Sequence, residues 1–405
     1  MVVFARYPAD PRVRREAEKL NRSGIAVDVI CLRGPVEPSV EEFGGTTAYR
    51  VMRSTEKNES VWKYFWLSAL FAVYAFIKLQ RLSLRERYSL VQAHNMPDFL
   101  IFIGVVHKIL GRPLVLDLHD LIPELLESKY GVGKNAVLGL LVRLMERMAC
   151  GFADHLITTS LGFRYRLIAK GVAPDKLTVV LNTADDDIFK IRSQRSWPRI
   201  SRDARLLYHG TIARRFGLHI AIEAVHKVQT TIPGTRLYIY GEYDSEYHTE
   251  LERLVFRLGM EEHVLMRGFV PEEQIVRIIE DSDIGVVPYL SDPFMDLALT
   301  TEAFEYISMG LPVVASRLRS LNALLDQPSI HYVAPGDAFD LANKIELLCC
   351  NPELRREYAD RAGRAYAEIS WSIMADRYLN LIDRLITKMA QKFIQLNDTP
   401  GARSF

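Results

Sequence analysis

The segment AFEYISMGLPVVAS, residues 303–316, predicts a short helix that leads directly into a strand. Residues 304–309 have helical character, Gly310 ends the helix, and the β-branched run 312–315 begins the strand. A helix followed at once by an apolar strand is typical of a βαβ unit, in which the strands run parallel. Glu305 is therefore expected on a helix that faces the carboxyl edge of a sheet, where open α/β sheets bind ligands.

The same alternation of short apolar runs and amphipathic stretches extends over most of the chain. In the first half it predicts strands over 2–5, 26–31, 90–93, 114–118 and 155–159. It then begins again and predicts strands over 205–208, 236–240, 264–266, 283–287 and 312–315. Two successive series of this kind favour an α/β protein with two doubly wound domains.

A chain of 405 residues is long enough for two domains of similar size. The polar stretch 185–203 has few apolar residues and no clear period, so we expect it to link a domain of residues 1–184 to a domain of residues 204–370. An amphipathic helix over 371–390 is expected to cross back to the first domain. The remaining residues, 391–405, are expected to form a frayed tail.

The charges of the chain nearly cancel, because 51 Lys and Arg oppose 50 Asp and Glu. Without a strong positive field, the chain is not expected to bind nucleic acid. The four cysteines follow no spacing typical of a metal site or of a disulfide framework. The N-terminal residues lack a charged start followed by an apolar core, so no export signal is predicted and a cytoplasmic location is expected.

One uncharged stretch departs from the pattern of a soluble protein. Residues 64–77, YFWLSALFAVYAFI, are followed at once by four basic residues, Lys78, Arg81, Arg85 and Arg87. The stretch is shorter than the roughly 20 apolar residues that a spanning helix needs. Two interpretations remain open: a buried core helix with a solvated basic turn, or a peripheral contact through 61–87 with the anionic inner face of the cell membrane.

Motifs in both halves carry a family resemblance. FEYISMGLPVVAS and YHGTIARRFGL, the latter at 208–218, resemble the donor site of glycosyltransferase family 4, whose members have the GT-B fold. Further motifs occur in the order expected for that family: DPRVRREAEKL at 10–20, HNMPDFL at 94–100, LDLHDLIPEL at 116–125, FADHLITTS at 152–160 and ISW at 369–371. The resemblance implies two Rossmann-like domains that face a central cleft, the first binding the acceptor and the second the donor.

The resemblance also assigns roles near the opening segment. The second glutamate of the family's E-x7-E pair holds the nucleotide ribose, and this role falls to Glu305. The first glutamate, which reaches the transferred sugar, corresponds to Leu297, and Glu302 stands where many relatives have a lysine. The sugar is then left to Asp296 or to backbone amides at the start of the helix, where partial positive charge also suits a diphosphate: Leu297, Ala298, Leu299, Thr300 and Thr301.

The turn within 208–218 is predicted to bind the pyrophosphate. Gly210 allows the backbone to approach a phosphate closely. Thr211 stands where the family has an arginine, so Arg214 or Arg215 is expected to supply the cation, with Arg215 favoured. The other predicted donor contacts lie at two strand ends of the same sheet: Gly241, Gly268, Phe269 and Val270.

In the first half, the motif DLHD places His119 at the carboxyl end of a strand. A buried, hydrogen-bonded histidine is the ordinary interpretation of such a residue. The corresponding position in the family borders the reacting sugar, so His119 is predicted to position hydroxyl groups. His119, Asp120 and Arg215 are the predicted catalytic residues, while Asp120, Glu124 and His94 are expected to engage the acceptor.

The first helix begins with Asp10 before Pro11, which is typical of an N-cap. Arg12 follows at a helix start, where the dipole disfavours cations. Asp10 and Arg12 are therefore further acceptor candidates if an anionic acceptor, such as a lipid-linked diphosphate, binds there. The alternative is that Arg12 pairs with neighbouring acidic residues.

The resemblance implies a retaining, hexosyltransferase-like glycosyltransferase. The resemblance implies a UDP- or GDP-linked sugar as co-substrate, with no other cofactor and no obligatory metal. The acceptor is expected to be a glycan or a lipid-linked molecule in cell-surface polysaccharide or lipid-linked glycan assembly. Two alternatives stay open: a sugar-nucleotide epimerase of the same fold, and a membrane-associated assembly partner without turnover.

Overall fold

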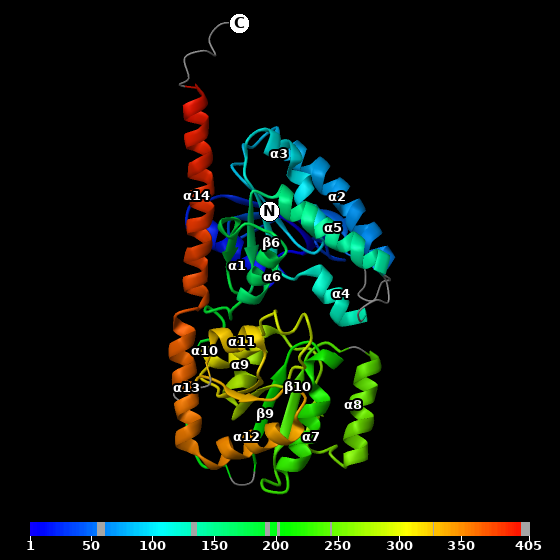
Figure 1. The fold of residues 1–405 in the computed structure, drawn as a ribbon, viewed down its shortest axis with the longest axis vertical. Coiled ribbons are helices and arrows are strands. Elements are labelled where there is room, and N and C mark those ends of the chain that lie inside the picture. Colours follow the sequence, from blue (N-terminus) through cyan, green and yellow to red (C-terminus); the bar gives the residue numbers. More distant parts are fainter. Residues whose placement is uncertain are drawn as a thin grey trace, which may run out of the picture. The chain divides into compact units, whose positions relative to one another are not determined.

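The computed structural model describes residues 1–54, 61–130, 136–190, 195–200, 203–243, 245–326 and 328–397. The chain divides into two compact units, one formed by Met1–Leu181 with Met374–Phe405 and the other by Asn182–Ile373. In each unit, helices cover both sides of a largely parallel sheet (Figure 1). This architecture confirms the predicted fold class of two doubly wound α/β domains.

The sheet of the first unit has eight strands in the order β3-β4-β2-β1-β5-β6-β7-β8. Neighbouring strands are parallel except for β3 and β4. The order reverses between β1 and β5, and such switch points are where open sheets bind ligands. The strands are β1 (Val2–Arg6), β2 (Val27–Arg33), β3 (Val40–Phe43), β4 (Thr46–Arg53), β5 (Val91–His94), β6 (Leu114–Leu118), β7 (His155–Thr158) and β8 (Leu177–Val179).

The helices of the first unit come from both ends of the chain. The α-helices are α1 (Pro11–Arg22), α2 (Val61–Ser83), α3 (Val105–Ile109), α4 (Ile122–Tyr130), α5 (Ala136–Phe152), α6 (Leu161–Ala169) and most of α14 (Trp371–Asn397). Two 3-10 helices, η1 (Asp98–Gly104) and η2 (Pro174–Lys176), complete the unit. The C-terminal helix is tied to this unit through Tyr378, whose hydroxyl donates to Gln92 Oε1 at 2.7 Å, and Arg377, whose Nη1 donates to the Val179 carbonyl at 3.1 Å.

The second unit has six parallel strands in the order β11-β10-β9-β12-β13-β14, with the switch point between β9 and β12. The strands are β9 (Arg205–His209), β10 (Arg236–Tyr240), β11 (Val264–Met266), β12 (Ile284–Val287), β13 (Val313–Ser316) and β14 (His331–Val333). The helices are η3 (Arg214–Phe216), α7 (Leu218–Val228), α8 (Ser245–Leu258), α9 (Glu272–Glu280), α10 (Thr301–Ser308), α11 (Arg319–Leu324), α12 (Ala338–Cys350) and α13 (Pro352–Ala367).

The polar stretch 185–203, predicted as a linker, lies within the second unit. The carboxylate of Asp186 accepts hydrogen bonds from the Tyr366 hydroxyl at 3.1 Å and from the Ser372 backbone N–H at 2.8 Å. These bonds attach the stretch to the end of α13 and the start of α14. The contacts are made to residues far away in the sequence, so a local sequence pattern does not reveal them.

Local signals explain where several elements begin and end. Asp10 Oδ1 accepts from the backbone N–H groups of Arg12 and Val13 at 3.1 Å, which confirms the predicted N-cap of α1. The helix α10 and the strand β13 confirm the prediction for 303–316. Between them, Gly310 has a φ of 67°, a left-handed conformation that favours glycine.

The long apolar helix α2 is only partly buried. Among the described residues it is the one helix whose length and composition would allow it to cross a membrane. One face packs on the sheet, since Phe71 is fully buried and its ring centroid lies 5.2 Å from that of Phe4 in β1. The other face leaves Trp62 and Trp66 70% and 72% exposed, so α2 is not a buried core helix.

Candidate active site

Two glycines meet at the carboxyl edge of the sheet in the second unit. Gly210 follows β9 with a φ of 129°, and Gly241 follows β10 with a φ of 149°. A Cβ atom at Gly241 would lie 1.7 Å from the carbonyl oxygen of Gly210, and a Cβ at Gly210 would lie 2.5 Å from Glu302 Oε1. Because side chains are excluded here, the backbone of this turn can approach a phosphate group closely.

Glu305 is held at the same edge by His209, the last residue of β9. His209 Nε2 pairs with Glu305 Oε2, while His209 Nδ1 and the Tyr306 hydroxyl lie 3.0 Å apart. Burial alone would lower the pKa of His209, but the Glu305 carboxylate raises it above its usual value. The side chain of Glu305 remains 16% exposed, so a carboxylate fixed in orientation can still accept hydrogen bonds from a ligand.

The start of α10 offers hydrogen-bond donors next to this carboxylate. Thr300 precedes the helix without capping it, and its buried Oγ1 has no hydrogen-bond partner among the described residues. Unsatisfied N–H groups at a helix start attract anions. Burial, followed by the Glu305 carboxylate, raises the pKa of Glu302, which favours a proton on the carboxyl group that lies against Gly210.

The two predicted phosphate cations differ in their surroundings. Arg214 is exposed and forms an ion pair with Glu250. The guanidinium carbon of Arg215 instead lies 5.9 Å from the ring centroid of Phe294, in the loop that leads to α10. Arg215 therefore lies on the side of the turn that faces this loop, and Thr211, the residue after Gly210, is exposed.

The loop that precedes α10 is fixed by hydrogen bonds to α11. The Ser320 hydroxyl contacts the carbonyl oxygens of Asp296 at 3.1 Å and of Leu297 at 2.7 Å. The Asp296 carboxylate accepts from the Ser291 hydroxyl at 3.0 Å and lies 3.8 Å from Arg319 Nε. The remaining predicted donor contacts are half-buried or exposed at their turns: Ala298, Leu299, Thr301, Gly268, Phe269 and Val270.

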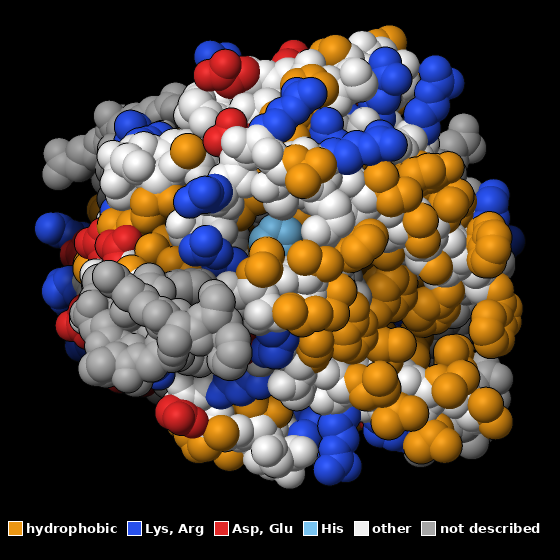
Figure 2. Space-filling view, turned by 90° about the horizontal axis from the view of Figure 1, so that it is seen from above, with side chains coloured by type: hydrophobic (Ala, Val, Ile, Leu, Met, Phe, Trp, Pro, Cys, Tyr) orange, Lys and Arg blue, Asp and Glu red, His pale blue; other side chains and the backbone are white. Residues whose placement is uncertain are grey.

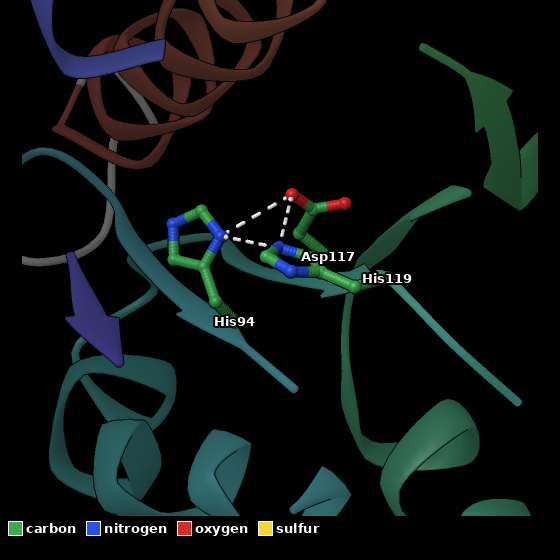
Figure 3. Close-up of side chains that lie close together, drawn as sticks. All are labelled: His94, Asp117 and His119. Atoms are coloured by element: carbon green, nitrogen blue, oxygen red, sulfur yellow. Dashed lines mark hydrogen bonds and ion pairs between the residues drawn. The ribbon is translucent and has the colours of Figure 1, made fainter. Parts of the chain in front are cut away.

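A second group of polar side chains gathers at the carboxyl edge of the sheet in the first unit. His94 ends β5, Asp117 lies beside it in β6, and His119 follows β6 (Figure 3). His94 Nδ1, Asp117 Oδ2 and His119 Nε2 all lie 3.2 Å from one another. Burial lowers the pKa of His94; burial would also lower that of His119, but the Asp117 carboxylate raises it above its usual value.

The predicted acceptor residue Arg12 belongs to the buried side of this group. Its Nε and Nη2 donate to the two carboxylate oxygens of Asp117 at 2.8 and 2.9 Å, and its Nη1 donates to the Val180 carbonyl at 3.1 Å. Arg12 Nη2 also lies 3.2 Å from Glu16 Oε1. The sequence left open whether Arg12 binds an acceptor or pairs with acids, and the structure shows the pairing.

The Arg12 guanidinium lies beside two carboxyl groups, Asp117 and Glu16, whose pKa values shift in opposite directions. Burial would raise the pKa of Asp117, but Arg12 holds it well below its usual range. Burial and the neighbouring Asp117 charge raise the pKa of Glu16. Asp117 therefore carries the negative charge, while Glu16 holds a proton over part of the neutral range.

Two imidazoles and one carboxylate form a ligand set that suits zinc or another first-row metal ion. The sequence did not indicate this group, because His94 and Asp117 are far apart along the chain and meet only through the register of β5 and β6. Arg12 already neutralises both oxygens of Asp117. Both oxygens of Asp117 therefore already have a hydrogen-bond donor within the chain.

Asn95, which the sequence analysis did not select, shapes the loop that carries His119. Its Oδ1 accepts from the His119 backbone N–H at 2.7 Å, and its Nδ2 donates to the Asp120 carbonyl at 2.6 Å. The Thr159 hydroxyl donates to the His119 carbonyl at 2.9 Å. These bonds fix a loop on which the His119 side chain is 21% exposed, so His119 is the member of the group that a ligand can reach.

Glu124, another predicted acceptor contact, lies in α4 and is buried. Its carboxylate accepts from Arg166 Nε at 2.6 Å and from Lys170 Nζ at 3.0 Å. Lys170 also contacts Glu146 of α5, so this group of charges joins α4, α5 and α6. The structure thus places His94, His119 and Arg12 together and places Glu124 in a separate set of ion pairs.

Two family profiles match the chain, one in each half. The family described as "Glycosyl transferase 4-like domain" matches residues 9–183, and "Glycosyl transferases group 1" matches residues 203–351. An uncharacterised glycosyltransferase of Methanocaldococcus jannaschii is 23% identical to this chain over 376 residues. That match covers 90% of this chain and 91% of the relative.

Solved structures have the same fold at low sequence identity. Sucrose-phosphate synthase from Thermosynechococcus elongatus superposes with a TM-score of 0.76 at 18% identity, covering 96% of this chain and 98% of that one. The Anabaena protein HepE, solved in complex with UDP, superposes with a TM-score of 0.68 at 18% identity, covering 95% and 98%.

Proposed function

We propose that the chain, which belongs to the family 4 glycosyltransferases of the GT-B fold, transfers the sugar of a UDP-linked sugar to an acceptor. The acceptor is a hydroxyl group of a lipid-linked molecule or a glycan. The observation that carries the donor assignment is the arrangement of Gly210, Gly241 and Glu305 at one sheet edge. The two glycine turns bring backbone without side chains to this edge, which suits a diphosphate, and a fixed carboxylate suits ribose hydroxyls. The UDP complex of the related fold HepE supports uridine as the base.

The main electrostatic task of the reaction is to stabilise the diphosphate as it leaves. We assign this task to the backbone N–H groups at the start of α10, to the turn at Gly210 and to Arg215. His119, fixed through its backbone by Asn95, is assigned to positioning acceptor or sugar hydroxyls.

The proposed location is the cytoplasmic face of the cell membrane, in the assembly of surface polysaccharide or lipid-linked glycan. The support is the exposed apolar face of α2 and the basic residues that follow its uncharged segment. Flotation of the full chain with anionic vesicles tests this part. Recovery of the protein with the vesicles at physiological salt supports it, and protein that stays at the bottom of the gradient contradicts it.

The activity is tested by incubating the full chain with a panel of UDP- and GDP-linked sugars, first alone and then with membrane lipid extracts as acceptors. We expect tightest binding to a UDP-linked sugar, and a product with retained anomeric configuration only when acceptor is present. Conversion of the sugar nucleotide without an acceptor would indicate an epimerase. If the chain bound no nucleotide, the result would favour the alternative of an assembly partner without turnover.

We also propose that no metal ion is required, since Arg215 and the helix start supply the positive charge. Treatment with EDTA followed by gel filtration should leave the transfer rate within about twofold. A loss of activity that Zn²⁺, Mn²⁺ or Mg²⁺ restores would contradict this proposal. If Zn²⁺ restores the activity of the wild type but not that of a His94→Ala variant, the metal ion is assigned to the group of His94, Asp117 and His119.

A further inference from the structure

The first unit contains an apolar pocket of about 300 Å³ bounded by α2, η1, α4 and α5. Its walls include the side chains of Trp62, Phe65, Phe99, Leu141, Val142 and Met148. Asp98, at the start of η1, is the one charged residue among those that line it. The volume lies at the lower end of the range of small-ligand pockets, roughly 300 to 1,000 Å³.

The pocket opens within a larger exposed apolar surface. Leu144, which lines the pocket, is exposed, and so are Trp66 on α2 and Leu140 on α5, which do not line it. Figure 2 shows this area as a broad region of hydrophobic side chains with a hollow in it, over the side where Figure 1 places α2 and α5. An apolar surface of this kind on a soluble unit usually marks an interaction site.

On α2 and α5, the exposed charged side chains that the structure describes are basic. Lys63 of α2 and Arg143 and Arg147 of α5 are exposed, and α2 contains no acidic residue. The acidic residue of α5, Glu146, is buried and bonded to Lys170 at 2.6 Å. An apolar surface with a basic margin is complementary to lipid chains and anionic head groups, and much less so to a second copy of the same basic surface.

The floor of the pocket is bonded to the candidate acceptor loop. Asn95 Nδ2 donates to Asp98 Oδ1 at 2.9 Å, and the same amide group contacts the Asp120 carbonyl and the His119 backbone N–H. Ile122, two residues after Asp120, lines the pocket. A ligand in the pocket therefore has one end within a few residues of His119.

The Asp98 carboxyl does not oppose an apolar occupant. Its burial raises its pKa to about 7, although the Asn95 amide opposes this shift. Glu146 raises the same pKa and Lys170 lowers it. At neutral pH or below, much of the floor is therefore uncharged.

We propose that this pocket holds one hydrocarbon chain of the lipid-linked acceptor, with the phosphate of that acceptor outside the pocket beside the loop at His119 and Asp120. The inference rests on the proposed function and adds the chemical class of the acceptor. The hydrocarbon chain displaces water from the apolar walls of the pocket, which favours binding. The exposed residues Lys63, Arg143 and Arg147 on α2 and α5 suit the anionic head groups of neighbouring lipids.

The test uses dodecyl phosphate below its micelle concentration as the probe and Trp62 as the reporter. Replacing the other three tryptophans, Trp66, Trp197 and Trp371, with Phe leaves Trp62 as the sole tryptophan, whose emission is excited selectively at wavelengths that tyrosine does not absorb. We expect a saturable change in Trp62 emission. A linear response without saturation would overturn the proposal.

Two variants make the test specific for the pocket. Val142→Phe fills the pocket from a buried position and should weaken dodecyl phosphate at least tenfold. Leu140→Phe is the matched control, because Leu140 is exposed on the same helix and does not line the pocket. If Val142→Phe does not fold, Leu141→Ser at the exposed rim should lower the affinity for dodecyl phosphate at least threefold. Equal affinity of the control and a folded pocket variant would overturn the proposal.

UDP binding, measured on the same proteins, separates this inference from the proposed function. The pocket lies in the first unit, so UDP affinity should be the same in the Val142→Phe and Leu140→Phe variants. A chain that binds UDP but not dodecyl phosphate would retain the proposed function and lose the pocket assignment. A chain that binds dodecyl phosphate in the pocket but no nucleotide would lose the proposed function.

Discussion

Replacement of Glu305 by alanine should weaken UDP binding while the chain stays folded. Glu305 Oε2 is paired with His209, and the partly exposed side chain has further acceptor capacity for ribose hydroxyls. A hydrogen bond to a charged group in a partly buried site contributes about 1 to 3 kcal/mol. Since 1.4 kcal/mol corresponds to a tenfold change, the dissociation constant should rise about 5- to 150-fold.

The measurement is titration calorimetry of the full chain with UDP at neutral pH. Glu305→Gln, which keeps the shape and removes the charge, should fall between the wild type and the alanine variant. Glu261→Ala is a suitable control, because Glu261 is exposed in the same unit on a turn before β11. An unchanged UDP affinity in a folded Glu305→Ala protein would refute the assignment of this carboxylate to the ribose.

The same substitution should change stability in a pH-dependent way. The folded-state pKa of His209 lies above its usual value because of Glu305. The ion pair therefore contributes fully below the usual histidine pKa, and its contribution is lost as pH rises through the raised value. Thermal unfolding of Glu305→Gln should differ from the wild type more at pH 6 than at pH 9, and an equal difference at both pH values would contradict the pairing.

Three further outcomes are expected. His119→Ala should lower the transfer rate about 10- to 100-fold with UDP affinity within twofold, whereas equal losses in both would indicate a structural role. Gly210→Ala should reduce UDP binding, because its Cβ would lie 2.5 Å from a carboxylate oxygen at a φ of 129°, while Gly363→Ala, with open space around it, should bind UDP normally. Glu16→Gln should raise the melting temperature at pH 8 but not at pH 5, because a buried carboxyl with a raised pKa costs stability as pH rises above its usual value; no difference at pH 8 would contradict a protonated Glu16.

Much of the fold could be predicted because parallel strands buried on both faces are continuous apolar runs. The strands β9, β10 and β13 were predicted to within one residue. Strands with a polar or exposed face were missed, such as β3 and β4 at the sheet edge, and so were the short strands β8 and β14. Such strands are defined by their pairing partners, which a local pattern does not contain.

The candidate site divides in the same way. Gly210, Gly241 and Glu305 lie at strand ends or helix starts, and those positions could be predicted from the sequence. The bond between Asn95 and the His119 loop and the pairing of Arg12 with Asp117 depend on the register of distant strands. Sequence motifs therefore indicated candidate side chains for the site. They did not indicate which of these side chains form ion pairs or hydrogen bonds within the protein itself.

The two-segment composition of the first unit bears on the order in which the chain folds during synthesis. The strands of this unit leave the ribosome early, yet Tyr378, which bonds to Gln92 beside Glu16, is made only after the whole second unit. The second unit is one continuous segment, so all of its strands are made before the helix that completes the first unit. Until the final helix emerges, the surface that it will cover beside α1 and β5 is open to solvent, so a nascent chain stalled near residue 373 exposes an unfinished core in its older half.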